Sequence, residues 1–214
     1  MTFVVFGDQK DHDSPTMRFY RGDSLEMLRR DSVWKSEIGI AHAAGFKVFL
    51  KPHIWIYEPF QNKWRSDIFP NNEENWVLWK NSYREFIHYY ARLAEENKVE
   101  LYSIGVEFSR LAMEKPVFWR GLIKEVRSIY SGKLTYAANW YEAYEKINFW
   151  DDLDYIGVQA YFPLVKHKNP SVEAISLGWE KYLPTLSKIA KQFNKKILFT
   201  EIGYKSTTDS AIEP

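Results

Sequence analysis

Cysteine is missing from the 214-residue sequence, and histidine occurs only five times. Without cysteine the chain has no disulfide, no thiolate metal site and no cysteine nucleophile, so redox chemistry does not indicate a compartment. The histidines show neither HxH nor HExxH spacing. This argues against a catalytic zinc and leaves carboxylate-bound magnesium or calcium open.

An excess of charge of one sign is also missing. Lys and Arg number 29 against 28 for Asp and Glu, which indicates neither a nucleic-acid partner nor an anionic membrane and favours a neutral or small polar partner. No stretch reaches the roughly 18 apolar residues of a membrane span. The chain starts with a strand-like FVVFG instead of the regions of a signal peptide, so we expect none within it, and its compartment stays open.

Apolar residues make up 45% of the chain. This is enough for a well-packed core, and we expect residues 1–214 to form a single domain. Apolar side chains at steps of three and four predict four helices, and Pro184 weakens the last of them locally. The expected helices span residues 32–44, 79–94, 116–131 and 179–193.

Short apolar runs, typical of buried strands, alternate with these helices. They read FVVFG, KVFL, LYSIGV, LTYAA, YIGVQA and ILFT. This alternation indicates a parallel sheet with helices outside it, either a (β/α) barrel or a doubly wound sheet. Neither a GxGxxG nor a P-loop motif follows the first strand, so a nucleotide-binding doubly wound sheet loses its main support.

The predicted strands end in polar and aromatic residues. Barrel enzymes place catalytic groups at the carboxyl ends of several strands, so this distribution favours a barrel. The residues at or after these ends are Asp8, Lys51, His53, Trp55, Glu107, Asn139, Trp140, Gln159, Tyr161 and Glu201. The run GDQKDHD at the first strand end lacks the spacing of a calcium loop and is interpreted as a solvated turn.

Glu107 and Glu201 are the two glutamates that directly follow an apolar strand. If the opening strand is the second of a barrel, they stand at strands four and seven. Two such carboxylates can divide a glycosidic reaction, one protonating the leaving oxygen and the other attacking the anomeric carbon, at a separation of roughly 5 to 5.5 Å. Tyr161 is placed to keep Glu201 ionised, and Asn139 to hold a sugar hydroxyl. For each glutamate taken alone, the alternative explanation is that it lies at a solvated rim or forms a salt bridge.

The aromatic residues near the strand ends have two interpretations. Trp55, Trp64 and Trp140 either stack on sugar rings or pack against the protein, whereas the helical spacing of other Trp residues predicts core positions. A histidine at such a position more often has a structural role than carries a proton, and we expect the same of His53. The tryptophans expected in the core are Trp79, Trp119 and Trp179.

Five motifs resemble glycoside hydrolase family 113, whose described members are mainly β-1,4-mannanases. They read LKPHIW, GVEFS, LTYAANW, FWDDLDYIGVQAYFPL and ILFTEIGYKS, and they cover nearly the whole chain in order. The resemblance implies a (β/α)8 barrel and a retaining double displacement that needs no cofactor. It also implies that Glu107 is the acid/base and Glu201 the nucleophile. We expect an oligo- or polysaccharide substrate, bound by Lys51, His53, Trp55, Trp64, Asn139, Trp140 and Tyr161.

Two departures from the family pattern affect these expectations. The wider clan usually has Asn immediately before its acid/base, where this chain has Val106, and Asn139 is the candidate to replace its contact with the sugar 2-hydroxyl. The match runs from strand two to strand seven, which predicts a barrel without strands one and eight. We therefore expect this chain to have an incomplete sugar site and weak activity, unless a partner chain completes the barrel or the open form is natural.

Other functions remain open at this point. Another retaining β-glycosidase of the clan would act on a glucan, a xylan or single mannosides. Lys51 at a strand end also suits a Schiff-base aldolase, although that role leaves both glutamates unexplained. A carbohydrate-binding fragment without turnover is the non-enzymatic alternative.

Overall fold

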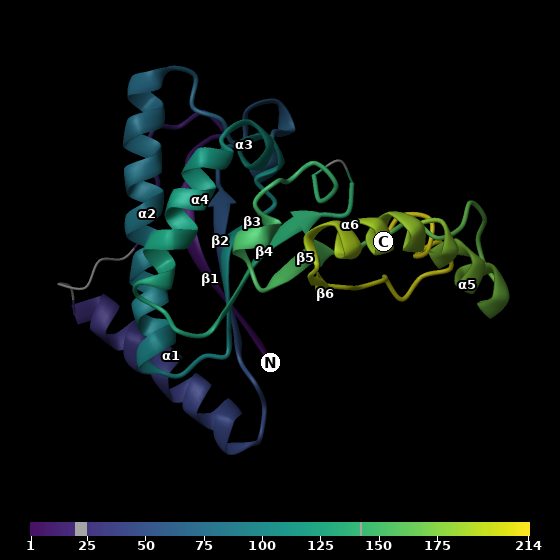
Figure 1. The fold of residues 1–214 in the computed structure, drawn as a ribbon, viewed down its shortest axis with the longest axis horizontal. Helices are drawn as coiled ribbons and strands as arrows, with labels where there is room; N and C mark the ends of the chain where they lie inside the picture. The colour runs from purple at the N-terminus through teal and green to yellow at the C-terminus, as the bar shows by residue number, and fades with distance from the viewer. Residues whose placement is uncertain (20–24, 142) are drawn as a thin grey trace.

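The computed structural model describes residues 1–19, 25–141 and 143–214. Its centre is one parallel sheet in which each strand pairs with the next strand along the chain (Figure 1). The strands are β1 (Thr2–Gln9), β2 (Phe49–Ile56), β3 (Leu101–Val106), β4 (Lys133–Asn139), β5 (Tyr155–Gln159) and β6 (Lys196–Glu201). The six apolar runs in the sequence therefore correspond to six strands. This strand order, with helices in the crossovers, is that of a (β/α) barrel.

Helices connect the strands, and α1, α2 and α4 lie along one side of the sheet (Figure 1). The helices are α1 (Leu25–Ala43), α2 (Glu73–Glu96), α3 (Ser109–Glu114), α4 (Pro116–Arg127), α5 (Val172–Glu180) and α6 (Leu183–Phe193). Three 3-10 turns are η1 (Phe60–Asn62), η2 (Arg65–Asp67) and η3 (Trp150–Asp152). None of the helices in the described part of the chain is long and apolar enough to cross a membrane.

The prediction of one continuous helix over residues 179–193 was wrong. Two helices occupy this region, with α5 ending at Glu180 and α6 beginning at Leu183. Pro184 has no amide hydrogen and its ring excludes the preceding helical turn, so it stands in the first turn of α6, where neither feature is costly. The apolar spacing continued across the break and concealed it.

Helix α2 shows how local sequence positions a buried face. The Asn72 side chain accepts a hydrogen bond from the Asn75 amide at 2.8 Å and caps the helix, while Glu73 and Glu74 lie in its positive first turn. Its aromatic face is inaccessible to solvent at Trp79 and Tyr83. These rings are satisfied at their polar ends, because Trp79 Nε1 donates to Gln9 Oε1 at 2.9 Å and Tyr83 donates to the Ile104 carbonyl at 2.9 Å.

The core between α2, α4 and the sheet is predominantly aromatic. Trp119 on α4 is fully buried, like Trp79, which confirms both as core residues. Trp119 meets Tyr136 of β4 edge-on, with ring centroids 5.3 Å apart. Trp179 is only half-buried and stacks on Phe199, with ring centroids 5.7 Å apart, so it covers the last strand of the sheet, β6.

Two register shifts interrupt the sheet near its carboxyl edge. Between β3 and β4 the pairing moves from Ser103↔Thr135 to Val106↔Ala137, which inserts one extra residue in β3. Between β5 and β6 it moves from Val158↔Phe199 to Gln159↔Glu201, which leaves Thr200 unpaired. Such bulges redirect the side chains that follow them. Both lie at the strand ends that carry the two glutamates.

Candidate active site

The carboxyl edge of the sheet collects the polar residues that the sequence placed at strand ends, because all six strands are parallel. On β2, alternation of side chains puts Lys51, His53 and Trp55 on one face. Their exposure rises along the strand, from 0% for Lys51 through 6% for His53 to 47% for Trp55. This face therefore presents a buried cation below and an aromatic ring at the rim.

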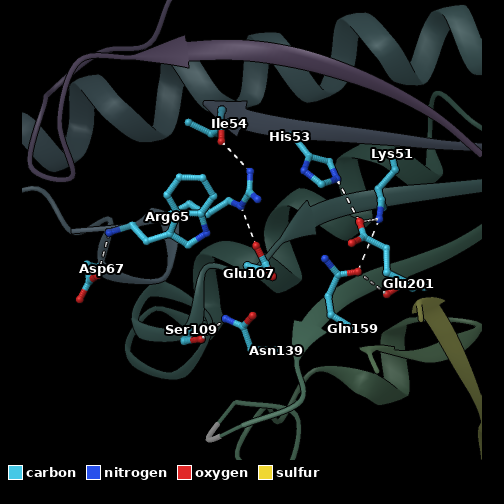
Figure 2. Close-up of polar contacts among 12 residues, drawn as sticks. Lys51, His53, Ile54, Arg65, Asp67, Glu107, Ser109, Asn139, Gln159 and Glu201 are labelled. Atoms are coloured by element: carbon cyan, nitrogen blue, oxygen red, sulfur yellow. Dashed lines mark hydrogen bonds and ion pairs between the residues drawn. The ribbon is translucent and has the colours of Figure 1, made fainter. Parts of the chain in front are cut away.

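Glu201, at the end of β6, is the centre of the best-connected group (Figure 2). Lys51 Nζ donates a hydrogen bond to Glu201 Oε1, and the Tyr161 hydroxyl donates to Oε2 at 2.7 Å. Burial alone would raise the pKa of Glu201, but the hydrogen bond and charge of Lys51, aided by Tyr161 and Gln159, outweigh it and hold that pKa below its ordinary value. These contacts keep Glu201 ionised.

Lys51 is a buried cation held between polar partners from two strands, β5 and β6. Burial lowers the pKa of Lys51, an effect opposed by its hydrogen bond to Glu201 and by the charges of Glu201 and Glu107. The Gln159 side-chain oxygen lies 3.5 Å from Nζ and accepts a hydrogen bond from Thr200 at 3.1 Å. Thr200 and Glu201 are consecutive, and both contact this group because the bulge in β6 breaks the alternation of side chains.

Tyr161, which follows β5, keeps its proton and can remain a donor to Glu201. Burial, the hydrogen bond to Glu201 and the negative charges of Glu201 and Glu107 raise the pKa of Tyr161 to about 12. The charge of Glu107 thus acts on both donors to Glu201. The two glutamates share one electrostatic environment.

His53 is buried beside this group as a neutral imidazole. Burial lowers its pKa to about 3, with contributions from the positive charges of Lys51 and Arg65. Its Nε2 atom lies 3.8 Å from Glu201 Oε1, beyond hydrogen-bonding distance, and has no partner among the described residues. The neutral ring therefore makes no ion pair with Glu201, and its Nε2 is a buried polar atom without a hydrogen bond to any other described residue.

Glu107 follows β3 in a left-handed backbone conformation, with φ of 61°. Non-glycine residues adopt this conformation rarely, and it recurs at functional sites. Its amide donates to the Ala137 carbonyl at 2.8 Å, and its own carbonyl accepts from the Ser109 amide at 2.9 Å, so the turn is held on both sides. Its side chain is 14% exposed and receives a hydrogen bond from Arg65 Nε to Oε2 at 2.7 Å.

The remaining predicted binding residues are divided between the rim and the protein interior. Trp55 and Trp64 meet edge-to-face, with ring centroids 5.7 Å apart. Trp140 is half-buried and packs against Phe162 at 5.9 Å. Asn139 is buried, and its amide nitrogen donates to Ser109 Oγ at 3.0 Å. Substrate binding by all of these residues stays a prediction.

Arg65 is a polar residue of this edge that the sequence did not reveal. It lies in the connection between β2 and α2, after Trp64, where no periodic pattern marks its orientation. Its guanidinium Nη1 also donates to the Ile54 carbonyl at 3.0 Å, which fixes it against β2 (Figure 2). The adjacent Trp64 was the only signal in this segment.

One group of metal-type ligands occurs in the described residues, at Asp11, His12 and Asp13, whose ligand atoms lie within 4.8 Å of one another. Asp11 Oδ1 already accepts hydrogen bonds from the His12 and Phe60 amides, at 2.7 and 3.1 Å. These bonds tie the β1 loop to η1. The cluster is therefore explained as a loop contact.

The fold and the carboxylates at its strand ends place the protein in the β/α-barrel class. The model of glycoside hydrolase family 113 matches residues 1–214, and the chain belongs to this family. The GH113 β-mannanase AaManA from Alicyclobacillus acidocaldarius, solved in complex with ManMIm, is 27% identical with a TM-score of 0.81. That comparison covers 99% of this chain and 62% of the mannanase.

Further structures set the range of similarity. Another solved GH113 β-1,4-mannanase, also in a complex, gives the same identity and TM-score and is covered over 63% of its length. The chain thus spans a little over three fifths of these mannanases. A β-glucuronidase from Ruminococcus gnavus, at 14% identity and a TM-score of 0.56, shares the fold. No match was found among curated protein sequences.

Proposed function

We propose that this chain carries the catalytic carboxylates of a retaining glycoside hydrolase that cleaves β-1,4-mannosidic linkages. The observation that carries the proposal is Glu201, a strand-end carboxylate held ionised by Lys51 and Tyr161 in a member of family 113. Its similarity to solved β-1,4-mannanases supports mannan as the substrate. Glu107, at the end of β3, is the second carboxylate that the reaction needs.

In the first step, Glu201 attacks the anomeric carbon while Glu107 gives a proton to the departing glycosidic oxygen. The bond between the sugar and its leaving group breaks, and a glycosyl ester forms on Glu201. In the second step Glu107, now ionised, takes a proton from a water molecule. The water oxygen attacks the anomeric carbon and releases Glu201 as a carboxylate, so the configuration is retained.

The other residues assist this reaction without reacting. Lys51 and Tyr161 stabilise Glu201 as an anion before attack and after release. The ring of His53, which lies beside Glu201, and the side chain of Asn139 are candidates for contacts with sugar hydroxyls, in place of the Asn that Val106 replaces. The rim rings Trp55 and Trp64 offer apolar faces for sugar rings.

Reducing-sugar release from β-1,4-mannan, with cellulose and xylan as controls, tests the proposal. We expect mannan-selective release by the parent and losses of about 10²-fold or more in Glu107→Gln and Glu201→Gln. Glu114→Gln removes an exposed glutamate of α3 and serves as the matched control, with activity near that of the parent. Retention of full activity in Glu201→Gln would contradict the assigned roles.

A second measurement separates the two glutamates. A 2-fluoro-mannosyl fluoride should form a stable ester on Glu201, which mass spectrometry can locate. Azide should restore turnover of an activated substrate in Glu107→Ala and give a product of retained configuration. In Glu201→Ala, any product formed with azide should not have the retained configuration. Selective hydrolysis of cellulose or xylan would instead assign another β-glycosidase. A folded parent that binds mannan without cleaving it, with binding unchanged in Glu201→Ala, would indicate a carbohydrate-binding protein.

A further inference from the structure

Arg65 makes a three-part contact that links the β2–α2 connection to Glu107. Its Nε donates to Glu107 Oε2 at 2.7 Å, and its Nη1 donates to the Ile54 carbonyl at 3.0 Å. The guanidinium carbon lies 4.5 Å from the centre of the Trp64 ring. The side chains of Arg65 and Glu107 are 11% and 14% exposed, so this is a largely buried ion pair and not a surface one.

The turn that carries Arg65 is itself held in place. The Asp67 carboxylate accepts a hydrogen bond from the Trp64 amide at 2.9 Å, and the Asp67 amide donates to the Trp64 carbonyl at 2.8 Å. Lys63 Nζ adds an ion pair with Asp67 at 3.4 Å. Because the turn is fixed before substrate arrives, little entropy is lost in orienting the guanidinium.

These contacts restrict Glu107 to one orientation. Its left-handed backbone fixes the direction in which the side chain leaves the strand, and Arg65 then fixes the rotation of the carboxyl group by occupying Oε2. The proton that Glu107 transfers must therefore be carried on Oε1. A general acid works only when this atom is within hydrogen-bonding reach of the leaving oxygen.

We propose that Arg65 is a positioning residue for proton transfer by Glu107, an inference that rests on the proposed function. Arg65 aims Oε1 at the glycosidic oxygen and stabilises the carboxylate that forms when Oε1 releases its proton. During the second step the same contact keeps Oε1 aimed at the water molecule from which Glu107 takes a proton. Arg65 touches neither the substrate bond that breaks nor the anomeric carbon.

Two substrates that differ in their need for an acid test this role. Cleavage of mannotetraose releases an alcohol that must be protonated, whereas 2,4-dinitrophenyl β-mannobioside releases a phenolate that leaves without a proton. In Arg65→Met we expect kcat/KM for mannotetraose to fall by about 10-fold or more. The value for the dinitrophenyl substrate should stay within about 3-fold of the parent, because kcat/KM reports the first step only.

Rescue by the conservative variant gives a second readout. Arg65→Lys, which keeps the charge but loses the planar fork, should recover part of the kcat/KM for mannotetraose that Arg65→Met loses. Arg110→Met is the matched control. Arg110 also pairs with a glutamate, Glu114, and lies over a ring, that of Phe69, but it is half-exposed on α3.

The outcomes distinguish this inference from the function on which it rests. Equal losses on both substrates, with no recovery in Arg65→Lys, would show that Arg65 supports the structure only and would overturn the inference. A parent that hydrolyses neither substrate would remove the proposed function and the role of Arg65 with it. Thermal unfolding of each variant, compared with the parent, shows whether a loss comes from the folded enzyme.

Discussion

The ammonium group of Lys51 on β2 donates a hydrogen bond to Glu201 on β6, 150 residues further along the chain. The lysine side chain is 1% exposed, so it cannot exchange this partner for water. Removing one member of such a pair leaves the other uncompensated, which is far more costly than losing a surface ion pair. Lys51 and Glu201 are therefore expected to act as a unit.

Replacing Lys51 by Met should impair the ionisation of Glu201. The hydrogen bond and charge of Lys51 lower the pKa of Glu201, so without them that pKa rises and Glu201 is protonated over a wider acidic range. We expect the acidic limb of kcat/KM to move to higher pH and the rate at neutral pH to fall by about 10-fold or more. A pH profile on a mannan oligosaccharide measures both effects. Lys188→Met, at an exposed position of α6, is the control, and an unmoved acidic limb in Lys51→Met would contradict the role.

His53 should make stability depend on pH. Its folded-state pKa of about 3 lies below the ordinary value of 6.5, so the unfolded chain binds a proton in this interval that the folded chain does not. The free energy of unfolding is then highest above pH 6.5 and falls as the pH decreases towards 3, by up to about 1.4 kcal/mol per pH unit from this group. In His53→Gln this contribution disappears.

Urea unfolding of the parent and His53→Gln between pH 7.5 and 5 measures the difference in slope. His167→Gln provides a matched substitution at an exposed histidine. Parallel slopes for the parent and His53→Gln would show that His53 takes up its proton equally in both states.

Trp55 should contribute to substrate binding more than to chemistry. It stands at the exposed end of the β2 face, 5.7 Å from the Trp64 ring. Loss of a stacking ring is expected to remove about 1.4 kcal/mol of binding, which is a tenfold rise in KM, with kcat close to the parental value. Kinetics of Trp55→Ala on mannan oligosaccharides test this. Phe46→Ala removes an aromatic ring of similar exposure at the other end of β2, and a KM raised equally in both variants would exclude a specific platform.

Gly157 on β5 should be intolerant of any side chain. A Cβ atom there would overlap the Tyr136 carbonyl oxygen and crowd Thr135 Oγ1, so backbone would have to move. We expect Gly157→Ala to lower the free energy of unfolding by about 1–3 kcal/mol. Gly121→Ala on α4 is the opposite case, because nothing lies within 4 Å of its added Cβ and alanine favours the helix by up to about 1 kcal/mol. Denaturant titration compares the two, and equal stability of both variants would contradict the packing argument.

Much of the fold could be predicted because buried parallel strands appear as short apolar runs and helices as apolar residues at steps of three and four. Strand ends could be located well enough to single out Glu107 and Glu201. The break between α5 and α6 was missed because the apolar spacing continued through Pro184. Arg65 was missed because its position depends on a turn closed by Asp67, and a turn of this kind leaves no periodic signal.

The two bulges make the number of residues in β3 and β6 as important as their identity. A regular strand turns alternate side chains to opposite faces. Without the bulge, Thr200 would pair with Gln159, and Glu201 would turn to the other face of the sheet. The same holds for the extra residue that precedes Glu107 in β3. An alignment that shifts either strand by one residue would therefore misplace the glutamate at its end while preserving every apolar run.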